Sequence, residues 1–223
     1  MKARTPAHIV VRVVEGIRSL RSLDMYTAIR TATLVVARRE DVRIVEISIQ
    51  RTHIHLVVEA RDTEALARGM KAFQISAARG INRALSIDGV PRRGRVFADR
   101  YHIEVITSPT QARNALLYVL NNWRKHGDNR DPVARAWPVD PFSSGVRFDG
   151  WAGGTPPWLW PLSYEPLVVK PARSWLLREG WRSLGPLDWN EVPGSRPSDA
   201  PVAPTHERQR RSATRADQPP RRY

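Results

Sequence analysis

Hydrophobic and polar residues follow two different periods along the first 127 residues. Runs in which about every second residue is apolar, as in a strand, alternate with stretches whose apolar residues recur every three or four positions, as in an amphipathic helix. The clearest helical stripe runs from Leu66 to Ala84. The pattern predicts strands over 8–14, 42–49, 53–59 and 100–106, and helices over 23–39, 62–85 and from 108 onward.

The predicted order, βαββαβ followed by α, is that of a ferredoxin-like α+β fold. We expect a four-stranded antiparallel sheet with two helices on one face, and a further helix after the last strand. Because side chains alternate across a strand, each strand divides into two sets. The apolar set, expected under the helices, is Ile9, Val11, Val13, Val45, Ile47, Ile49, Ile54, Leu56 and Val58. The polar set, expected on a face left free for chemistry or a ligand, is His8, Arg12, Glu46, Ser48, Gln50, His53 and His55.

Composition changes sharply near Gly127, after which proline-rich clusters appear, and all eight tryptophans lie from Trp123 onward. We therefore predict a core domain over 1–127 and a Trp/Pro-rich extension over 128–193, with a short amphipathic helix within 171–182. Packing is the expected role of the tryptophans. Residues 194–223 are rich in Arg, Pro, Ser and Ala, so they bury too little apolar surface to offset the entropy of ordering. This last segment is predicted to be a disordered basic tail.

Charge narrows the class of partner. Lys and Arg number 36 against 22 Asp and Glu, a formal net charge of +14, which makes nucleic acid the first partner to consider and an anionic membrane surface the second. The chain has no cysteine, which excludes disulfides, thiolate zinc sites and cysteine nucleophiles. No apolar segment is long enough for a signal peptide core or a membrane span, so we expect a cytoplasmic protein without membrane contact.

Two histidines flank Ile54 in the third predicted strand. His53 and His55 then project to the same face, where two neutral imidazole nitrogens can hold one divalent ion. Such a triplet also arises by chance, and two histidines on a half-exposed strand are the alternative interpretation.

The last predicted helix opens at Ser108, where Ser can cap, Pro109 occupies the first turn and Gln111 has the place of Gln in a capping box. Tyr118 and Asn122 are four residues apart and share one face with Gln111, Asn114 and Lys125. The apolar residues of the helix, namely Ala112, Leu116, Val119 and Trp123, gather on the opposite face. A phenol is a weak nucleophile until a base or cation activates it. A solvated tyrosine among amides is the alternative interpretation.

Taken together, four segments resemble the single-tyrosine transposases of the HUH nuclease superfamily, and most closely the branch of REP-associated tyrosine transposases. They are HIVVRVVEG (8–16), HIHLVVEA (53–60), FADRYHIEVITSP (97–109) and YVLNNWRKHG (118–127). The resemblance covers about residues 6–127, and the motifs and the elements both fall in the expected order. Two positions depart from the family pattern: Thr52 stands where Asn commonly precedes the first histidine, and Trp123 replaces a frequent Pro.

The resemblance implies a metal-dependent endonuclease and strand transferase that acts on single-stranded or hairpin DNA. His53, His55 and Asn122 would hold Mg²⁺ or Mn²⁺, and Tyr118 would attack the scissile phosphate to give a 5′-phosphotyrosine intermediate and a free 3′-hydroxyl. It leaves both a monomer and a homodimer open. A bacterial protein engaged in DNA transposition and recombination, associated with the nucleoid, is the expectation.

Basic residues are expected to contact DNA phosphates, which position a strand without reading its sequence. They are Arg12 on the first strand, Arg68, Lys71, Arg79 and Arg83 on the second helix, Arg92, Arg93 and Arg95 in the loop before the fourth strand, and Lys125 on the last helix. A solvated helix face and a flexible loop are the alternative interpretation for most of these residues.

Two alternatives concern function. A non-catalytic or domesticated nucleic-acid-binding protein is the main one, although ferredoxin-like RNA binders usually display aromatic residues where this sheet carries histidines. A relaxase or replication initiator is less favoured, because the chain has one candidate tyrosine on the helix and no helicase-like extension. Within the site, His102 is either a further ligand or an ordinary sheet histidine, and Tyr101 is a weaker candidate nucleophile than Tyr118.

Overall fold

The computed structural model describes residues 5–98, 100–130, 132–154, 156–157, 161 and 163–194. The tail expected beyond residue 194 lies outside the described residues. The core elements occur in the predicted order: β1 (Ala7–Arg12), α1 (Leu23–Ala37), β2 (Val42–Ile49), β3 (His53–Ala60), α2 (Thr63–Ala84), β4 (His102–Val105) and α3 (Pro109–Lys125). The extension adds the short helices α4 (Pro132–Arg135) and α5 (Trp175–Arg178), and 3₁₀ turns at Asp128–Arg130, Ser144–Arg147 and Gly180–Leu184.

The four strands form one antiparallel sheet in the order β2-β3-β1-β4. This is the ferredoxin-like order expected from the sequence, with β3 and β1 at the centre. In the register of the central pair, Val10 lies opposite His55 and Arg12 lies opposite His53. The two histidines of β3 therefore lie in the middle of the sheet.

The helices begin where the sequence predicts. Asp62 precedes α2 and its carboxylate accepts a hydrogen bond from the backbone N–H of Ala65 (2.7 Å). Ser108 precedes α3 and accepts from the N–H of Gln111 (3.2 Å), while the Gln111 side chain accepts from the N–H of Thr107 (2.8 Å). These bonds satisfy backbone donors that the first helical turn leaves unpaired, and they fix the start of the helix that carries Tyr118.

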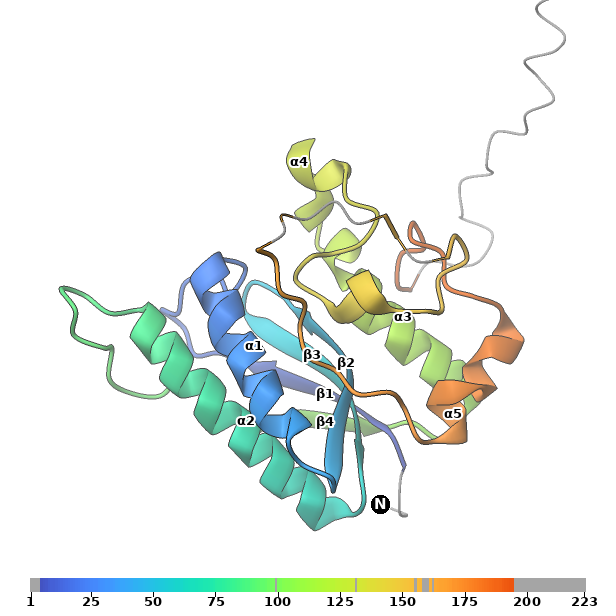
Figure 1. The fold of residues 1–223 in the computed structure, drawn as a ribbon, viewed down its shortest axis with the longest axis horizontal. Helices are drawn as coiled ribbons and strands as arrows, with labels where there is room; N and C mark the ends of the chain where they lie inside the picture. Colours follow the sequence, from blue (N-terminus) through green and yellow to red (C-terminus); the bar gives the residue numbers. More distant parts are fainter. Residues whose placement is uncertain are drawn as a thin grey trace, which may run out of the picture.

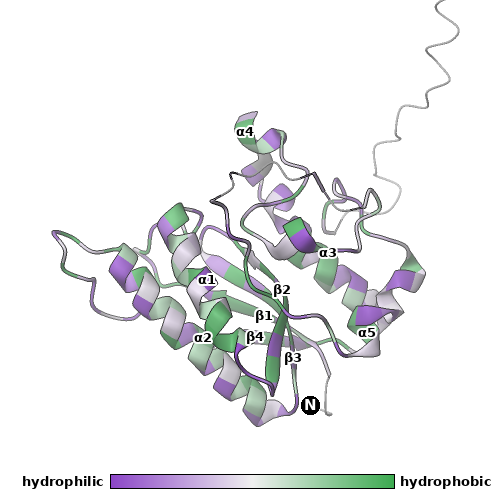
Figure 2. Cartoon of the chain, viewed as in Figure 1, coloured by the Kyte–Doolittle hydropathy of each residue, from purple (hydrophilic) through white to green (hydrophobic). Residues whose placement is uncertain are grey.

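Helices α1 and α2 cover one face of the sheet (Figure 1). We call this the packed face. Its core is apolar and includes Ile9, Ile47, Leu56 and Phe73, each fully buried. Hydrophobic residues predominate along the central strands beneath the helices (Figure 2). Burial of this continuous apolar surface is the main source of stability for the fold.

A β-bulge in β2 corrects one sequence expectation. The register between β2 and β3 shifts between Ile44 and Glu46, so strict alternation fails there. Ile44 packs in the core of the packed face, whereas Val45, which we assigned to that face, joins Val57 in a second apolar cluster on the opposite side.

The second face of the sheet is not free, contrary to expectation. Helix α3 and the extension lie across it (Figure 1). The second cluster joins Val45 and Val57 of the sheet to Leu116 of α3 and to Trp151 and Trp181 of the extension. We call this the site face, since the apolar cover occupies only part of it and leaves the histidines of β3 beside a cavity.

The extension is anchored by charged groups that are almost fully removed from water. Arg21 donates two hydrogen bonds of 2.8 Å to the carboxylate of Asp140, which is fully buried. Glu59 of β3 accepts from the backbone N–H groups of Arg173 and Ser174 (2.7 and 2.8 Å) just before α5. Lys170 donates its backbone N–H to the carbonyl of Ile44 (2.8 Å), so the extension also covers the outer edge of the sheet.

Two expectations for the extension are met in part. The amphipathic helix within 171–182 is a single α-helical turn followed by a 3₁₀ turn, rather than one continuous helix. Trp151 and Trp181 are buried as packing residues, but Trp175 is 60% exposed. Trp158 and Trp160 lie outside the described residues. Of the helices that the structure describes, none is both long and apolar enough to cross a membrane.

Candidate active site

The histidine pair of β3 meets α3 on the site face. The ring centroids of His53 and His55 are 4.6 Å apart, with the rings nearly perpendicular. His55 is buried and His53 is half-buried. Alternation along β3 turns both rings to the same side of the sheet, as the sequence predicts.

Helix α3 brings Tyr118 and Asn122 onto these rings. The ring centroid of Tyr118 is 5.1 Å from that of His55, in an edge-to-face arrangement. The Asn122 side chain is fully buried, and its amide nitrogen lies 3.1 Å from Nε2 of His55. The four-residue spacing predicted that Tyr118 and Asn122 share a helical face. The tertiary structure adds that this face is turned toward the histidines of the same chain.

Two further histidines take part in the cluster, and the sequence did not single them out as site residues. His8 of β1 places Nε2 3.1 Å from Nδ1 of His55. His126, directly after α3, has its ring centroid 5.8 Å from that of His53. The available signals were the place of His8 in the polar set of β1 and the spacing of His126, four residues after Asn122.

Burial governs the charge of these rings. Desolvation is the largest cause that lowers the pKa of His53 to about 4 and that of His55 to about 2, and neighbouring histidines and Arg12 add to the effect. Desolvation also lowers the pKa of His8, against the opposing charge of Glu104. All three imidazoles are therefore neutral near pH 7 and carry a lone pair, which is the form that binds metal ions.

The donors fit a divalent cation with mixed ligands. Within the described parts of the chain, no three or more His, Asp or Glu side chains are grouped so as to hold a metal ion. A site on His53 and His55 therefore needs an oxygen ligand of another kind. The Asn122 carbonyl oxygen, Oδ1, is buried and makes no hydrogen bond, so it is an unused oxygen beside the histidine pair. Amide oxygens suit Mg²⁺ and Mn²⁺, and imidazole suits transition ions.

A cavity of about 480 Å³ opens beside the cluster. Strands β1, β3 and β4 form its floor and α3 forms a wall. Gln111 and Asn114 line it together with Tyr118, as their shared helical face predicts. His102 and Glu104 of β4 and Arg12 of β1 complete the polar lining. Tyr101, by contrast, packs against the core of the packed face, away from this cavity.

The predicted DNA-contacting residues divide between the two sides of the sheet. Arg12 lines the cavity, and Nζ of Lys125 lies 5.4 Å from the ring centroid of Tyr118. The loop with Arg92, Arg93 and Arg95 leads to β1, where the N–H of Ala98 donates to the carbonyl of Arg12 (2.9 Å), but the Arg92 side chain itself donates to Asn82 of α2 (2.9 Å).

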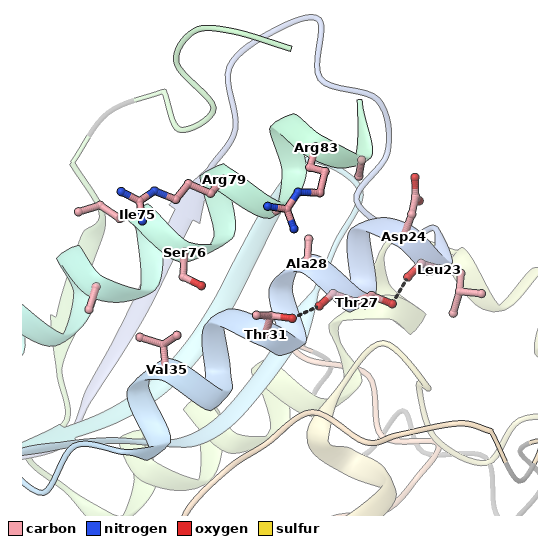
Figure 3. Close-up of a pocket in the computed structure, with 13 residues that line it drawn as sticks. Leu23, Asp24, Thr27, Ala28, Thr31, Val35, Ile75, Ser76, Arg79 and Arg83 are labelled. Carbon is pink, nitrogen blue, oxygen red and sulfur yellow. Dashed lines mark hydrogen bonds between the residues drawn. The ribbon is translucent and has the colours of Figure 1, made fainter. Parts of the chain in front are cut away.

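The basic residues of α2 lie elsewhere. Helix α2 covers the packed face, so Arg68, Lys71, Arg79 and Arg83 are in the layer on the other side of the sheet from the cavity. Arg68 is paired with Glu64 and Asp41. Arg79 and Arg83 border a groove between α1 and α2 (Figure 3). The sequence could not separate these residues from Arg12, because it reports a basic helix face but not the layer that the helix occupies.

The paired histidines of the sheet and the tyrosine of α3 lie together, as the resemblance to the single-tyrosine transposases implies. A family model described as "Transposase IS200 like" matches residues 3–122, more than half of the chain. The chain therefore belongs to the IS200-like transposases, and by class it is a DNA transposase.

One solved structure supports the fold. A REP-associated tyrosine transposase bound to a REP hairpin is 17% identical, with a TM-score of 0.52, and the match covers 75% of this chain and 94% of that one. A predicted transposase from Deinococcus radiodurans R1 is 12% identical, with a TM-score of 0.38, over 58% of this chain and 93% of that one. A search of curated proteins gave no significant match.

Proposed function

We propose that this transposase cleaves and rejoins single-stranded DNA at or near a hairpin, with Tyr118 as the nucleophile and with Mg²⁺ or Mn²⁺ held by His53, His55 and Asn122. The observation that carries the proposal is that, within one chain, the Tyr118 ring lies 5.1 Å from the ring of His55, one of a neutral histidine pair beside an open cavity. Since one chain supplies every proposed group, catalysis in a monomer is sufficient, and a homodimer is not required.

The metal ligands act together in this proposal. His53 and His55 offer neutral nitrogens, and Asn122 offers the buried oxygen that has no hydrogen-bond partner. A divalent cation bound there would polarise the scissile phosphate and stabilise the negative charge that develops on it. Burial of His55 and Asn122 holds both side chains in place before DNA binds.

Tyr118 performs the covalent step. Its phenolic oxygen attacks phosphorus, the new P–O bond to Tyr118 forms as the P–O3′ bond breaks, and the phenolic proton passes to solvent while the departing 3′ oxygen gains one. The product is a 5′-phosphotyrosine link with a free 3′-hydroxyl. A 3′-hydroxyl from a second strand reverses the step and restores the phenol, so one phosphodiester replaces another and no ATP is needed.

Basic groups around the cavity would guide the strand. Lys125 and Arg12 place positive charge beside Tyr118 and His53, where they attract the phosphates next to the scissile bond. Arg92, Arg93 and Arg95 belong to a loop held by Asn82 of α2, so they would contact DNA only beyond the cavity. A hairpin substrate is proposed from the REP-associated transposase of the same fold, which is bound to a REP hairpin. Action on chromosomal DNA implies association with the nucleoid.

A denaturing gel tests the nucleophile. Full-length protein incubated with labelled hairpin DNA and Mn²⁺ is expected to give a covalent protein–DNA band, and Tyr118→Phe should lose that band because the ring remains but the attacking oxygen is gone. Tyr101→Phe is the matched control and should keep the band, since Tyr101 packs on the other side of the sheet. A band that persists in Tyr118→Phe would contradict the assignment.

The same assay tests the metal ligands. His53→Ala, His55→Ala and Asn122→Ala should each abolish cleavage while mobility shifts in EDTA show DNA affinity within about threefold of the wild type, because Arg12 and Lys125 remain. If all variants and the wild type bind DNA but none forms an adduct under any divalent ion, the chain is a DNA-binding protein without strand-transfer activity.

A further inference from the structure

Both ring nitrogens of His55 lie within hydrogen-bond distance of another side chain, one an amide and the other an imidazole. The Asn122 amide nitrogen lies 3.1 Å from Nε2, and Nε2 of His8 lies 3.1 Å from Nδ1. The His8 and His55 rings are stacked, with centroids 5.3 Å apart and planes 25° from parallel. No other residue in the described parts of the chain is hydrogen-bonded to the His55 ring in this structure.

The chemistry of these contacts selects one tautomer of His55. An amide nitrogen can only donate, so Nε2 of His55 must accept through its lone pair. A neutral imidazole has one N–H, which must then be on Nδ1, and this N–H donates to Nε2 of His8. The direction of both hydrogen bonds thus follows from one donor-only group, Asn122.

The strand register places His8 beside both His55 and Glu104. In the β1 register, His8 lies opposite Val57 of β3 and opposite Glu104 of β4. Its ring therefore stands between His55 on one neighbouring strand and a carboxylate on the other. The negative charge of Glu104 acts on the His8 ring, and His8 accepts from His55 in the neutral tautomer that carries its N–H on Nδ1. Nε2 of His8 is then free to accept.

We propose that His8 is a positioning residue, which accepts the Nδ1–H of His55 and thereby keeps the lone pair of His55 Nε2 directed at Asn122 and the cavity. The role in metal binding rests on the function proposed above, in which the divalent ion takes the place of the Asn122 N–H at Nε2 and Asn122 turns its oxygen to the same ion. A ligand imidazole generally gives its other N–H to an acceptor that fixes its orientation, and loss of such an acceptor weakens metal binding by about 10–100-fold. Here the acceptor is a second histidine rather than a carboxylate.

Two variants separate this role from simple packing. In His8→Gln, the amide oxygen lies near the position of Nε2 and can still accept from His55. In His8→Leu, the apolar side chain fills the space but offers no acceptor. A packing role predicts that Leu, which keeps the apolar contact, is at least as well tolerated as Gln. The positioning role predicts the opposite order.

The first measurement needs no metal and no activity. Two-bond ¹H–¹⁵N NMR spectra of the full-length, metal-free protein at pH 7.5 report which nitrogen of His55 carries hydrogen. We expect Nδ1–H in the wild type and in His8→Gln, and a mixture with Nε2–H in His8→Leu. Nε2–H in the wild type, or an unchanged spectrum of His55 in His8→Leu, would overturn the proposal.

The second measurement is Mn²⁺ affinity by calorimetry in the absence of DNA. We expect His8→Leu to bind 10–100-fold more weakly than the wild type, in line with loss of the acceptor, and His8→Gln to bind within about threefold. Equal affinity of His8→Leu and the wild type would reject the positioning role. If the wild type itself binds no Mn²⁺, the proposed metal-dependent function fails, and the NMR result alone decides whether His8 orients His55. Circular dichroism of both variants checks that they are folded.

Discussion

The two faces of the sheet are built on opposite principles. On the packed face, Ile9 and Leu56 of the sheet and Phe73 of α2 belong to one apolar core. On the site face, the apolar cluster around Trp181 adjoins neutral histidines, a buried carboxyl group and ion pairs that link the extension to the core. The first face stabilises the fold. On the site face, α3 and the extension exclude water from the buried polar groups. Each of these groups then depends on its hydrogen bonds within the protein.

The largest effect is expected on the packed face. Phe73→Ala should lower the free energy of unfolding by about 3–5 kcal/mol, because it leaves a cavity in a fully buried core. Ile75→Ala is the matched control on the same helix, and since Ile75 is 43% exposed the loss should stay below about 1 kcal/mol. Urea unfolding followed by circular dichroism measures both. Similar losses in the two variants would mean that α2 does not supply the core as described.

A second prediction breaks the cover of the site face. Asp140→Ala should lower the free energy of unfolding by about 3 kcal/mol, because buried Arg21 loses the carboxylate that accepts two hydrogen bonds and keeps only Asp128 at 3.7 Å. The control is Asp149→Ala, which removes an exposed partner of Arg182 and should change stability by less than about 0.5 kcal/mol. Limited proteolysis within 141–190 should accelerate in the first variant only. Equal rates of proteolysis in the two variants would show that Asp140 does not anchor the extension.

A substitution of Glu46, unlike the two above, is expected to raise the free energy of unfolding. Burial is the main cause that raises the pKa of this carboxyl group to about 8, although the hydroxyl of Ser144 donates a hydrogen bond to it. Between about pH 4.5 and 8 the unfolded chain ionises Glu46 while the folded protein keeps it protonated, so this group makes stability fall as pH rises. Glu46→Gln keeps the size and removes the ionisation.

Unfolding of Glu46→Gln and the wild type at pH 5 and pH 8 tests this sign. We expect the stability of the variant relative to the wild type to increase by about 3–4 kcal/mol from pH 5 to pH 8. If the difference in stability between the variant and the wild type is the same at both pH values, Glu46 is not buried in its neutral form. The result would sharpen the contrast with the packed face, where burial raises the pKa of Tyr26 to about 12, so that this phenol stays neutral throughout the pH range tested.

The smallest effect concerns His53 and has the reverse pH dependence. Its folded pKa of about 4 lies below the ordinary 6.5, so the unfolded state gains a proton first as the solution is acidified. The contribution of His53 to stability is complete above pH 6.5 and is lost as pH falls from 6.5 toward 4. Because the ring is only half-buried, we expect about 1 kcal/mol between pH 7 and pH 5.

His53→Gln should reduce this acid sensitivity when urea midpoints are measured in EDTA at pH 7 and pH 5. Tyr118→Phe is a matched control, since it alters a ring of the same cavity without removing an imidazole, and it should retain the wild-type difference. If His53→Gln is as acid-sensitive as the wild type, burial of His53 does not depress its pKa as the structure indicates.

Much of the fold and part of the site could be predicted, for reasons that differ between elements. The capping residues of α2 and α3 and the four-residue spacing of Tyr118 and Asn122 act over one or two helical turns, so the sequence reports them directly. Val45 was assigned to the wrong face because a bulge depends on how β2 meets β3. Arg79 and Arg83 lie away from the cavity, and nothing local distinguishes their helix face from a DNA-facing one.

By itself, the sequence determined the order of helices and strands, the apolar stripes and the placement of His53 and His55 on one side of a strand, since all of these depend on neighbours within a few residues. Only the tertiary structure decided that the extension covers the second face, that His8 meets His55, and that α3 turns Tyr118 toward them. His8 and His55 are 47 positions apart in the sequence, and His55 and Asn122 are 67 apart. They depend on strand register and layer packing, where a shift of one residue turns a side chain to the opposite face of the sheet.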